Sequence, residues 1–249
     1  MIETEIQLST NDGLLDAFVC HPEEGGPHPG IIFYMDAPAI REELRDMARR
    51  LASVGYYVIL PNLYYRIGTE GNYGFDLSRL RLDPDEHKKM SAAMATLTNA
   101  RIVEDTAFLL EHLRSDDAVS TTPLACVGYC MSGPFVLHVC AAYPDEFTAG
   151  AAYHGVKMVT DSADSPHLCV PAIHAEIYIG FAENDELVDK SDWQTLDDAL
   201  SEAGVKHRVE IYPGVGHGFV FAERALYKKA AAERHWETLL ALLQRCLIP

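Results

Sequence analysis

The sequence predicts an α/β fold, with a mostly parallel central sheet and helices on both faces. Short apolar runs of strand length alternate along the chain with amphipathic segments of helix length. Most of the apolar runs are continuous, as expected for parallel strands that are buried on both faces. No repeat, low-complexity stretch or long linker interrupts the 249 residues, so we expect residues 1–249 to form a single domain.

The first half of the chain should begin with an antiparallel hairpin at one sheet edge. The segments TEIQLS and LLDAFVCH are separated by TNDG, which suits a tight turn. Continuous apolar runs predict strands at 30–35 and 56–62, the second stopped by Pro61. Amphipathic runs predict helices at 41–55, ending at Gly55, and at 99–115. We expect residues 63–89 to be loop and short helix.

The second half repeats the alternation of strand and helix. Apolar runs predict strands at 123–129, 147–155, 175–185 and 207–214. A helix should begin at Gly133, another should span 191–204 with Ser191 as its N-cap, and a long helix should close the chain at 223–246. Strands that alternate with helices in this way indicate a sheet covered on both faces.

The composition excludes several classes of partner. The chain carries 20 Lys and Arg against 37 Asp and Glu, a formal charge of −17, which disfavours binding to nucleic acid or to an anionic membrane. No secretory leader is visible in MIETEIQLST, and no apolar run has the length of a bilayer span. The six cysteines contain no CxxC pair, so we expect reduced thiols in a cytoplasmic protein. No HExxH-like metal motif or glycine-rich phosphate loop occurs.

The segment GYCMSG has the pattern of a nucleophile elbow. An apolar strand ends at Gly128 and Tyr129, Cys130 follows, and a helix begins at Gly133, which is the context of the G-x-S-x-G motif of α/β-hydrolases with cysteine in place of serine. The amino end of the helix favours a thiolate. The alternative is that Cys130 simply packs like a small apolar residue. The sequence around it favours a nucleophile.

The same fold predicts where an acid and a base should follow. Their order in α/β-hydrolases is nucleophile, acid, histidine. Asp185 comes directly after the strand AEIYIGFA, and His217 lies between two glycines after the strand HRVEIY. Only His154, in YHG, has a comparable position after a strand. Asp185 and His217 are therefore the predicted partners of Cys130, although Asp185 taken alone would be a solvated acidic turn.

The positions of these residues predict a catalytic role for each. His217 should take the thiol proton of Cys130 and later protonate the leaving group, while Asp185 orients the imidazole. The backbone N–H groups of Met131 and Ala37 should form the oxyanion hole. A carbonyl substrate would pass through a thioester that water then hydrolyses.

The chain resembles the dienelactone hydrolase family almost end to end. The stretches GYYVILPNLYYR, GYCMSG, ENDELV, GVGHGF and ERALYKKAAAERHW carry the resemblance, in that order. It implies a single-domain α/β-hydrolase without a cofactor, in which Cys130, Asp185 and His217 form the triad. The best-known activity of the family is the hydrolysis of dienelactone to maleylacetate. We therefore expect a small-molecule ester or lactone as substrate, and a monomer or homodimer.

Two positions depart from the family pattern. Where relatives carry a glutamate that contacts the resting thiol, this chain has Asp36 in YMDAPAI, which we expect to keep the thiol protonated. The alternative is that Asp36 only caps the loop before the helix that starts at residue 41. Where relatives carry a substrate-binding arginine after the histidine, it has Phe221, and the nearest arginine is Arg224. The candidate substrate-binding residues are Arg66, Tyr129, Phe221 and Arg224. The segment 66–89 contains further cations that could bind a substrate carboxylate in place of that arginine, or could simply be solvated surface charge: Arg79, Arg81, Lys88 and Lys89.

Three alternative functions compete with this interpretation. One is a carboxylesterase, arylesterase or phosphotriesterase of broad specificity on the same fold. Another is a redox-sensing protein, in which Cys130 reacts with oxidants and a thiol such as Cys126 resolves it. The last is a binding domain without catalysis, which the three filled catalytic positions disfavour.

Overall fold

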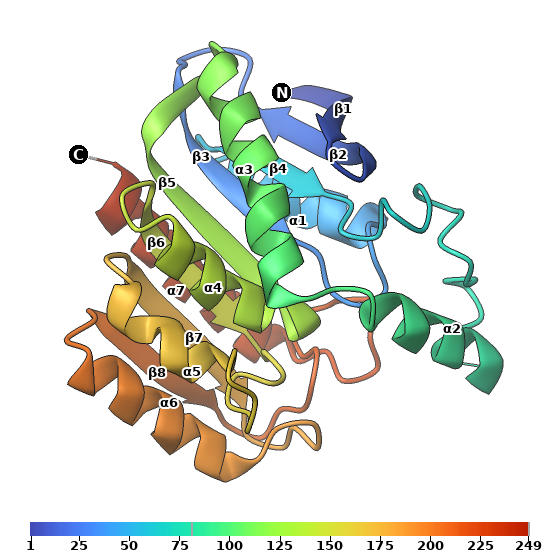
Figure 1. Ribbon diagram of the computed structural model, residues 1–249, viewed down its shortest axis with the longest axis vertical. Helices are drawn as coiled ribbons and strands as arrows, with labels where there is room; N and C mark the ends of the chain where they lie inside the picture. Colours follow the sequence, from blue (N-terminus) through green and yellow to red (C-terminus); the bar gives the residue numbers. More distant parts are fainter. Residues whose placement is uncertain (81, 249) are drawn as a thin grey trace. The chain divides into compact units, whose positions relative to one another are not determined.

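The computed structural model describes residues 1–80 and 82–248, and it confirms the predicted α/β class. The backbone divides into two compact units, one covering Met1–Ser120 and the other beginning at Thr121. Each unit contains strands flanked by helices (Figure 1).

The first unit is a mixed sheet of four strands. It contains β1 (Ile2–Thr10), β2 (Gly13–His21), β3 (His28–Tyr34), α1 (Glu42–Ala52), β4 (Tyr57–Pro61), α2 (Pro84–Met94) and α3 (Asn99–Ser115). β1 and β2 form the predicted antiparallel hairpin, with Thr10 opposite Gly13 at the turn. β4 pairs antiparallel with β2 and parallel with β3. The predicted helix at 99–115 has the expected bounds.

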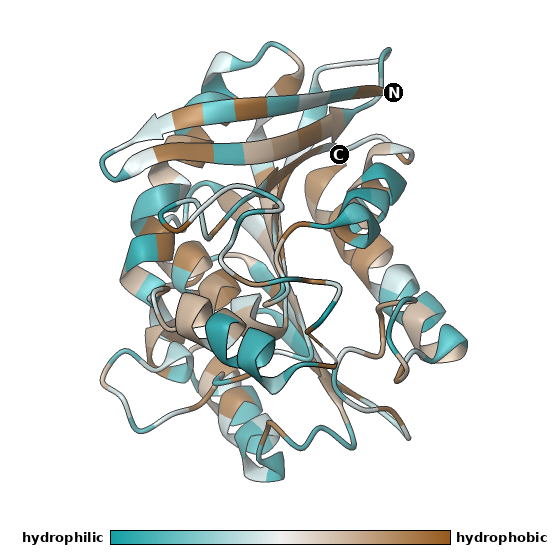
Figure 2. Ribbon diagram, turned by 90° about the vertical axis from the view of Figure 1, so that its right-hand side faces the viewer, coloured by the Kyte–Doolittle hydropathy of each residue, from teal (hydrophilic) through white to brown (hydrophobic). Residues whose placement is uncertain are grey.

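The hairpin is solvated on one side and packed on the other. Figure 2 shows apolar and polar residues alternating along β1, as expected where one face of a sheet meets water, whereas β2 is continuously buried from Ala17 to Cys20. On the packed side, α1 lies against β2 and β4, with the guanidinium groups of Arg45 and Arg49 over the ring of Phe18 at 4.6 and 5.6 Å. Helix α1 therefore shields the apolar face of the hairpin from solvent.

The second unit is a parallel sheet. β5 (Val119–Tyr129), which starts in the first unit, is followed by a 3₁₀ turn at Cys130–Ser132 and by α4 (Gly133–Ala142). The remaining elements are β6 (Phe147–Tyr153), α5 (Pro166–Cys169), a 3₁₀ turn at Val170–Ala172, β7 (Glu176–Ala182), α6 (Lys190–Glu202), β8 (His207–Tyr212) and α7 (Lys229–Leu247). β5, β6, β7 and β8 pair in that order, all parallel. Their carboxyl ends consequently share one edge.

Helices cover both faces of this parallel sheet. α4 and α7 both pack against β6, and in Figure 1 α4 lies in front of the strands and α7 behind them. The apolar runs that predicted these strands are buried almost throughout. This burial on both faces is the reason their polarity does not alternate.

A buried polar network joins α7 to the strands. His235 Nε2 lies 2.8 Å from the hydroxyl of Tyr129, and Thr238 Oγ1 lies 3.1 Å from that of Tyr153 and 3.2 Å from that of Tyr212. Tyr178 and Tyr212 share a further hydroxyl contact of 2.9 Å. Because buried polar groups cost free energy unless they are hydrogen-bonded, these pairs fix the helix at one position on the sheet.

The start of the last helix is a correction to the sequence prediction. α7 begins at Lys229 rather than at residue 223. Residues 221–228 form successive turns instead, and the N–H of Lys228 donates to the carbonyl of Phe219 rather than to a helical partner. That bond turns the chain away from a helical path. The segment 223–228 therefore belongs to the loop that follows β8.

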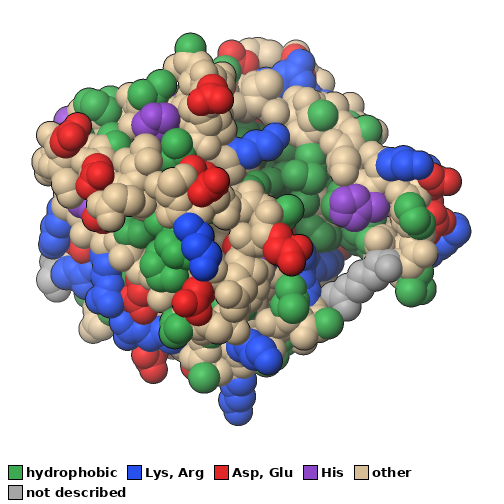
Figure 3. Space-filling view, turned by 90° about the horizontal axis from the view of Figure 1, so that it is seen from below, with side chains coloured by type: hydrophobic (Ala, Val, Ile, Leu, Met, Phe, Trp, Pro, Cys, Tyr) green, Lys and Arg blue, Asp and Glu red, His purple; other side chains and the backbone are tan. Residues whose placement is uncertain are grey.

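The surface charge and the polarity of the helices are those of a chain rich in charged residues. In the view of Figure 3, acidic, basic and apolar side chains are interspersed, which is the usual pattern of solvated charge. Within residues 1–80 and 82–248, every helix is too short or too polar to span a bilayer.

Candidate active site

Cys130 stands on a sharp turn between β5 and α4. Its φ angle is 56°, in the left-handed region that residues other than glycine seldom occupy. The flanking glycines are required by close packing: a Cβ on Gly128 would lie 2.5 Å from the carbonyl oxygen of Ser132, and one on Gly133 would lie 2.6 Å from the Cα of Gly155. The small residues of GYCMSG thus permit the turn that presents the cysteine.

The loops after β7 and β8 are tied together by backbone hydrogen bonds. The N–H of Glu183 donates to the carbonyl of Tyr212 at 3.0 Å, and the N–H of Asn184 donates to that of Val215 at 2.9 Å. These bonds place Asp185 and His217 beside each other, although they are 32 positions apart in the chain.

The structure brings Cys130, His217 and Asp185 into one line of polar contacts. His217 Nδ1 donates to Asp185 Oδ2 at 2.7 Å, and His217 Nε2 lies 3.1 Å from Cys130 Sγ. Asp185 Oδ1 accepts the N–H of Leu187 at 3.0 Å, which fixes the carboxylate. Cys130 and Asp185 are each 7% exposed, so the line is largely shielded from water. This geometry fits a nucleophile, a base and an orienting acid.

The environment of His217 favours its charged form. Burial lowers the pKa of the imidazole, but hydrogen bonds to Asp185 and Cys130, together with their negative charge, outweigh it and raise the pKa to about 9. A proton on His217 is consequently retained through the neutral range whenever Cys130 is a thiolate. Cys130 and His217 can therefore form a thiolate–imidazolium ion pair, and the thiolate is the nucleophilic form of a cysteine.

Asp36 has a partner that the sequence did not reveal. Its carboxylate is fully buried and accepts two hydrogen bonds from Arg41, from Nη1 at 2.5 Å and from Nη2 at 3.2 Å. Arg41 Nη2 also donates to Glu43 at 2.9 Å. Arg41 immediately precedes α1, where the sequence indicates only the start of a helix. The charge of Asp36 is therefore partly neutralised within its own unit.

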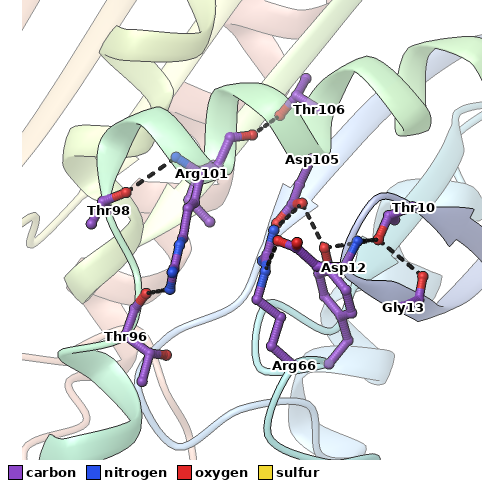
Figure 4. A network of polar contacts seen from close by, with 11 residues as sticks. Thr10, Asp12, Gly13, Arg66, Thr96, Thr98, Arg101, Asp105 and Thr106 are labelled. Atoms are coloured by element: carbon purple, nitrogen blue, oxygen red, sulfur yellow. Dashed lines mark hydrogen bonds and ion pairs between the residues drawn. The ribbon is translucent and has the colours of Figure 1, made fainter.

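Arg66 is held by carboxylates of the protein itself. Nη1 and Nη2 each donate to Asp105 at 2.8 Å, and Nε donates to Asp12 at 2.6 Å (Figure 4). Asp105 is 2% exposed, and the hydroxyl of Tyr65 also donates to it at 2.8 Å. A bidentate pair of this kind uses the donors that a substrate carboxylate would need. The guanidinium of Arg66 is therefore engaged by the protein itself, and its role toward a substrate stays a prediction.

The other cations of this region are also engaged, where they are described. Each forms an ion pair on its own segment: Arg79 with Asp83 at 2.6 Å, Lys88 with Asp85 at 2.9 Å and Lys89 with Glu86 at 2.8 Å. Arg81 lies outside the described residues.

The remaining substrate-binding candidates differ in their exposure. Tyr129 and Phe221 are both fully buried, and the hydroxyl of Tyr129 faces His235 on α7, so neither side chain is accessible to a substrate. Arg224 is partly exposed, and its guanidinium lies 5.0 Å from the centre of the Phe221 ring. The roles of Phe221 and Arg224 toward a substrate stay predictions, and of the two only Arg224 is partly exposed.

His154 is the other histidine that follows a predicted strand, and the sequence assigned it no role. It is fully buried at the end of β6, and its ring centre lies 4.9 Å from that of His217. Within the described part of the chain, no cluster of three or more His, Cys, Asp or Glu side chains is arranged to hold a metal ion.

Comparison with known sequences identifies relatives along nearly the whole chain. The model of the dienelactone hydrolase family matches residues 15–247. A protein of Escherichia coli named "Putative carboxymethylenebutenolidase" is 27% identical over 233 residues, covering 91% of this chain and 80% of that protein. A protein of the same name from Methylorubrum extorquens is 25% identical over 243 residues, covering 96% and 79%.

Comparison with solved structures confirms the α/β-hydrolase fold. A crystal structure described as "Putative Dienelactone Hydrolase", from Klebsiella pneumoniae, has a TM-score of 0.84 at 23% identity, covering 97% of both chains. A dienelactone hydrolase-like promiscuous phosphotriesterase from metagenomic libraries has a TM-score of 0.71 at 17% identity, covering 99% of both. The matched range of the family model includes Cys130, Asp185 and His217. The chain therefore belongs to the dienelactone hydrolase family.

Proposed function

We propose that this hydrolase cleaves carboxylic esters or lactones with Cys130 as nucleophile, His217 as base and Asp185 as orienting acid. One observation carries the proposal: Cys130 Sγ, both ring nitrogens of His217 and Asp185 Oδ2 form a continuous line with contacts of 3.1 and 2.7 Å. The left-handed conformation of Cys130 adds support, because strained backbone of this kind is typical of nucleophile elbows.

The reaction follows from the order of these groups. His217 Nε2 accepts the thiol proton, and the thiolate of Cys130 attacks the carbonyl carbon to give a tetrahedral oxyanion. The carbon–oxygen bond to the leaving group then breaks, and the imidazolium returns its proton to the leaving oxygen. Water, deprotonated by His217, hydrolyses the thioester and releases the acid and the thiol. In this proposal the N–H groups of Met131 and Ala37 bind the oxyanion.

A panel of substrates with and without thiol alkylation tests this function. We expect p-nitrophenyl esters, lactones or both to be hydrolysed, and iodoacetamide at neutral pH to abolish the activity in step with modification of Cys130. Mass spectrometry should show Cys130 modified before the other five cysteines. Aryl phosphotriesters complete the panel, since one structural relative carries that activity in its name. Full activity after stoichiometric modification of Cys130 would refute the thiol mechanism.

A redox role for Cys130 receives less support. Cys126, the thiol that such a role would use for resolution, has its sulfur 3.6 Å from that of Cys140 on α4. Burial raises the pKa of the Cys126 thiol well above its ordinary value, so it is a poor nucleophile. All six cysteines are free, and we include a cytoplasmic location in the proposal because free thiols suit a reducing compartment.

Asp36 provides a separate prediction about the resting thiol. If its charge keeps Cys130 protonated, as the sequence pattern predicts, Asp36→Asn should speed the alkylation of Cys130 at neutral pH. The same variant removes the charge of one partner from a buried ion pair, so the free energy of unfolding should fall by about 3 kcal/mol. The measurements are the iodoacetamide rate against pH and a denaturant titration.

Arg41→Met is the matched control for Asp36→Asn. It breaks the same ion pair but retains the carboxylate, so it should lose comparable stability without faster alkylation. Equal alkylation rates in the wild type and Asp36→Asn would leave Asp36 with a structural role only. Faster alkylation in both variants would attribute the effect to loosened packing.

A further inference from the structure

We propose that His154 is a positioning residue that holds the ring of His217 in line with Cys130 and Asp185. The proposal rests on the proposed function, because it concerns the same base. His154 lies in the turn that follows β6, and its ring meets that of His217 edge-on, with centres 4.9 Å apart and planes at 71°.

The backbone of this turn is anchored to the nucleophile. The N–H of Val156 donates to the carbonyl of Cys130 at 3.1 Å, and the N–H of His154 donates to that of Gly180 on β7 at 2.7 Å. Gly155 packs against the first turn of α4, where a Cβ on it would lie 3.1 Å from the Cα of Gly133. The position of His154 is therefore set relative to Cys130, while its ring is set against the base.

The base needs such a contact. His217 lies in a loop between Gly216 and Gly218, and its two polar contacts fix only its nitrogens. These two contacts do not by themselves prevent a sideways shift of the loop, and such a shift would move Nε2 away from Cys130 Sγ and Nδ1 away from Asp185 Oδ2. An edge-on contact from a fixed neighbour restricts the shift.

His154 is held by packing and stays uncharged. Its fully buried ring lies among Tyr129, Phe219, Phe221 and His217, at centre distances of 4.9 to 5.9 Å. Within the described residues neither ring nitrogen forms a hydrogen bond. Burial, with the positive charges of His217, Arg224 and His235, lowers the pKa of His154 well below its ordinary value. A neutral neighbour lets His217 carry a proton without repulsion.

The backbone of His154 has an uncommon conformation. The φ angle of His154 is 40°, in the left-handed region where asparagine and histidine are tolerated better than most residues. Strain of this kind concentrates at functional sites. It also selects the test variants, because His154→Asn tolerates the backbone and removes the ring, whereas His154→Phe keeps a ring.

The test measures two quantities separately: the kinetic constants for hydrolysis, and the pH dependence of Cys130 alkylation, which reports the protonation of His217. For His154→Asn we expect kcat to fall about tenfold to hundredfold with little change in KM, since misplacement by about 1 Å has effects of this size. The upper transition in the pH profile of Cys130 alkylation, set by the proton on His217, should move from about 9 toward the ordinary value of 6.5. His154→Phe should keep kcat and the transition near those of the wild type.

His235→Phe is the control for loss of another buried histidine. His235 is equally buried but contacts Tyr129, Tyr153 and Trp236, so this variant should lower the melting temperature and leave the transition near pH 9. An unchanged transition in His154→Asn, or equal losses in the Asn and Phe variants, would overturn the proposal. If Cys130→Ala kept full activity while His154→Asn moved the transition, the proposed function would fail and the positioning role would stand.

Discussion

Cys130→Ala should reduce ester or lactone turnover to the uncatalysed background. The expected loss is on the order of 10⁴-fold or more, because in the proposed mechanism the sulfur forms the covalent intermediate and no step proceeds without it. The side chain is small and 7% exposed, so removal of its sulfur should leave folding nearly intact. The measurement is kcat/KM on the best substrate of the panel, with circular dichroism as the folding control.

Cys130→Ser is the matched variant. It keeps a small polar side chain within reach of His217 Nε2 and preserves the backbone conformation, but its hydroxyl is much harder to deprotonate. We expect weak activity, between that of the wild type and that of the alanine variant. If the alanine variant retained more than a few per cent of wild-type activity, another residue would have to be the nucleophile.

His217→Ala should lower kcat on the order of 10³-fold or more, the second large effect. In the proposed mechanism the residue serves both as the base for the thiol and as the acid for the leaving group, so its loss should disable two steps. Because the groups act as a unit, adding His217→Ala to Cys130→Ala should cause almost no further loss. Asp185→Asn tests the third member, since it disturbs the imidazole tautomer. Greater sensitivity at Asp189 or Glu186 would show that the acid is misassigned.

The pH profile provides an independent check on His217. Since its pKa is raised to about 9, the imidazolium that protonates the leaving group is lost above that pH, and kcat/KM should fall there. The proton on His217 also stabilises the folded protein. Because the folded pKa exceeds the ordinary 6.5, that contribution is complete below pH 6.5 and disappears as the pH rises through about 9. An activity profile still rising well above pH 9 would contradict the assignment.

Much of the scaffold, and the proximity of Cys130, Asp185 and His217, could be predicted because they depend on local patterns. The continuous apolar runs identified the buried strands, and the helix at 99–115 has capping residues that delimit it. Cys130, Asp185 and His217 each follow a strand, and the carboxyl ends of parallel strands meet at one edge. Sequence order and strand position were therefore sufficient to bring them together.

What could not be predicted depends on pairing between distant side chains. A list of cations cannot show that Arg66 is held by Asp105, or that Arg41 neutralises Asp36, because both pairs form only when the chain has folded. Tyr129 looks like a site residue in sequence, yet its hydroxyl is directed to α7. The start of α7 was wrong because a single long-range bond at Lys228 overrides helical periodicity.

The hydrogen bonds between α7 and the tyrosines bear on how the chain tolerates shortening. A truncation that ended before residue 229 would delete none of the proposed catalytic residues Cys130, Asp185 and His217. It would nevertheless remove His235 and Thr238, leaving the hydroxyls of Tyr129 and Tyr153 without these partners and β6 without one of its covering helices. An inactive truncation product would thus report the loss of a supporting layer, and deletion mapping from the carboxyl terminus would mislocate the chemistry.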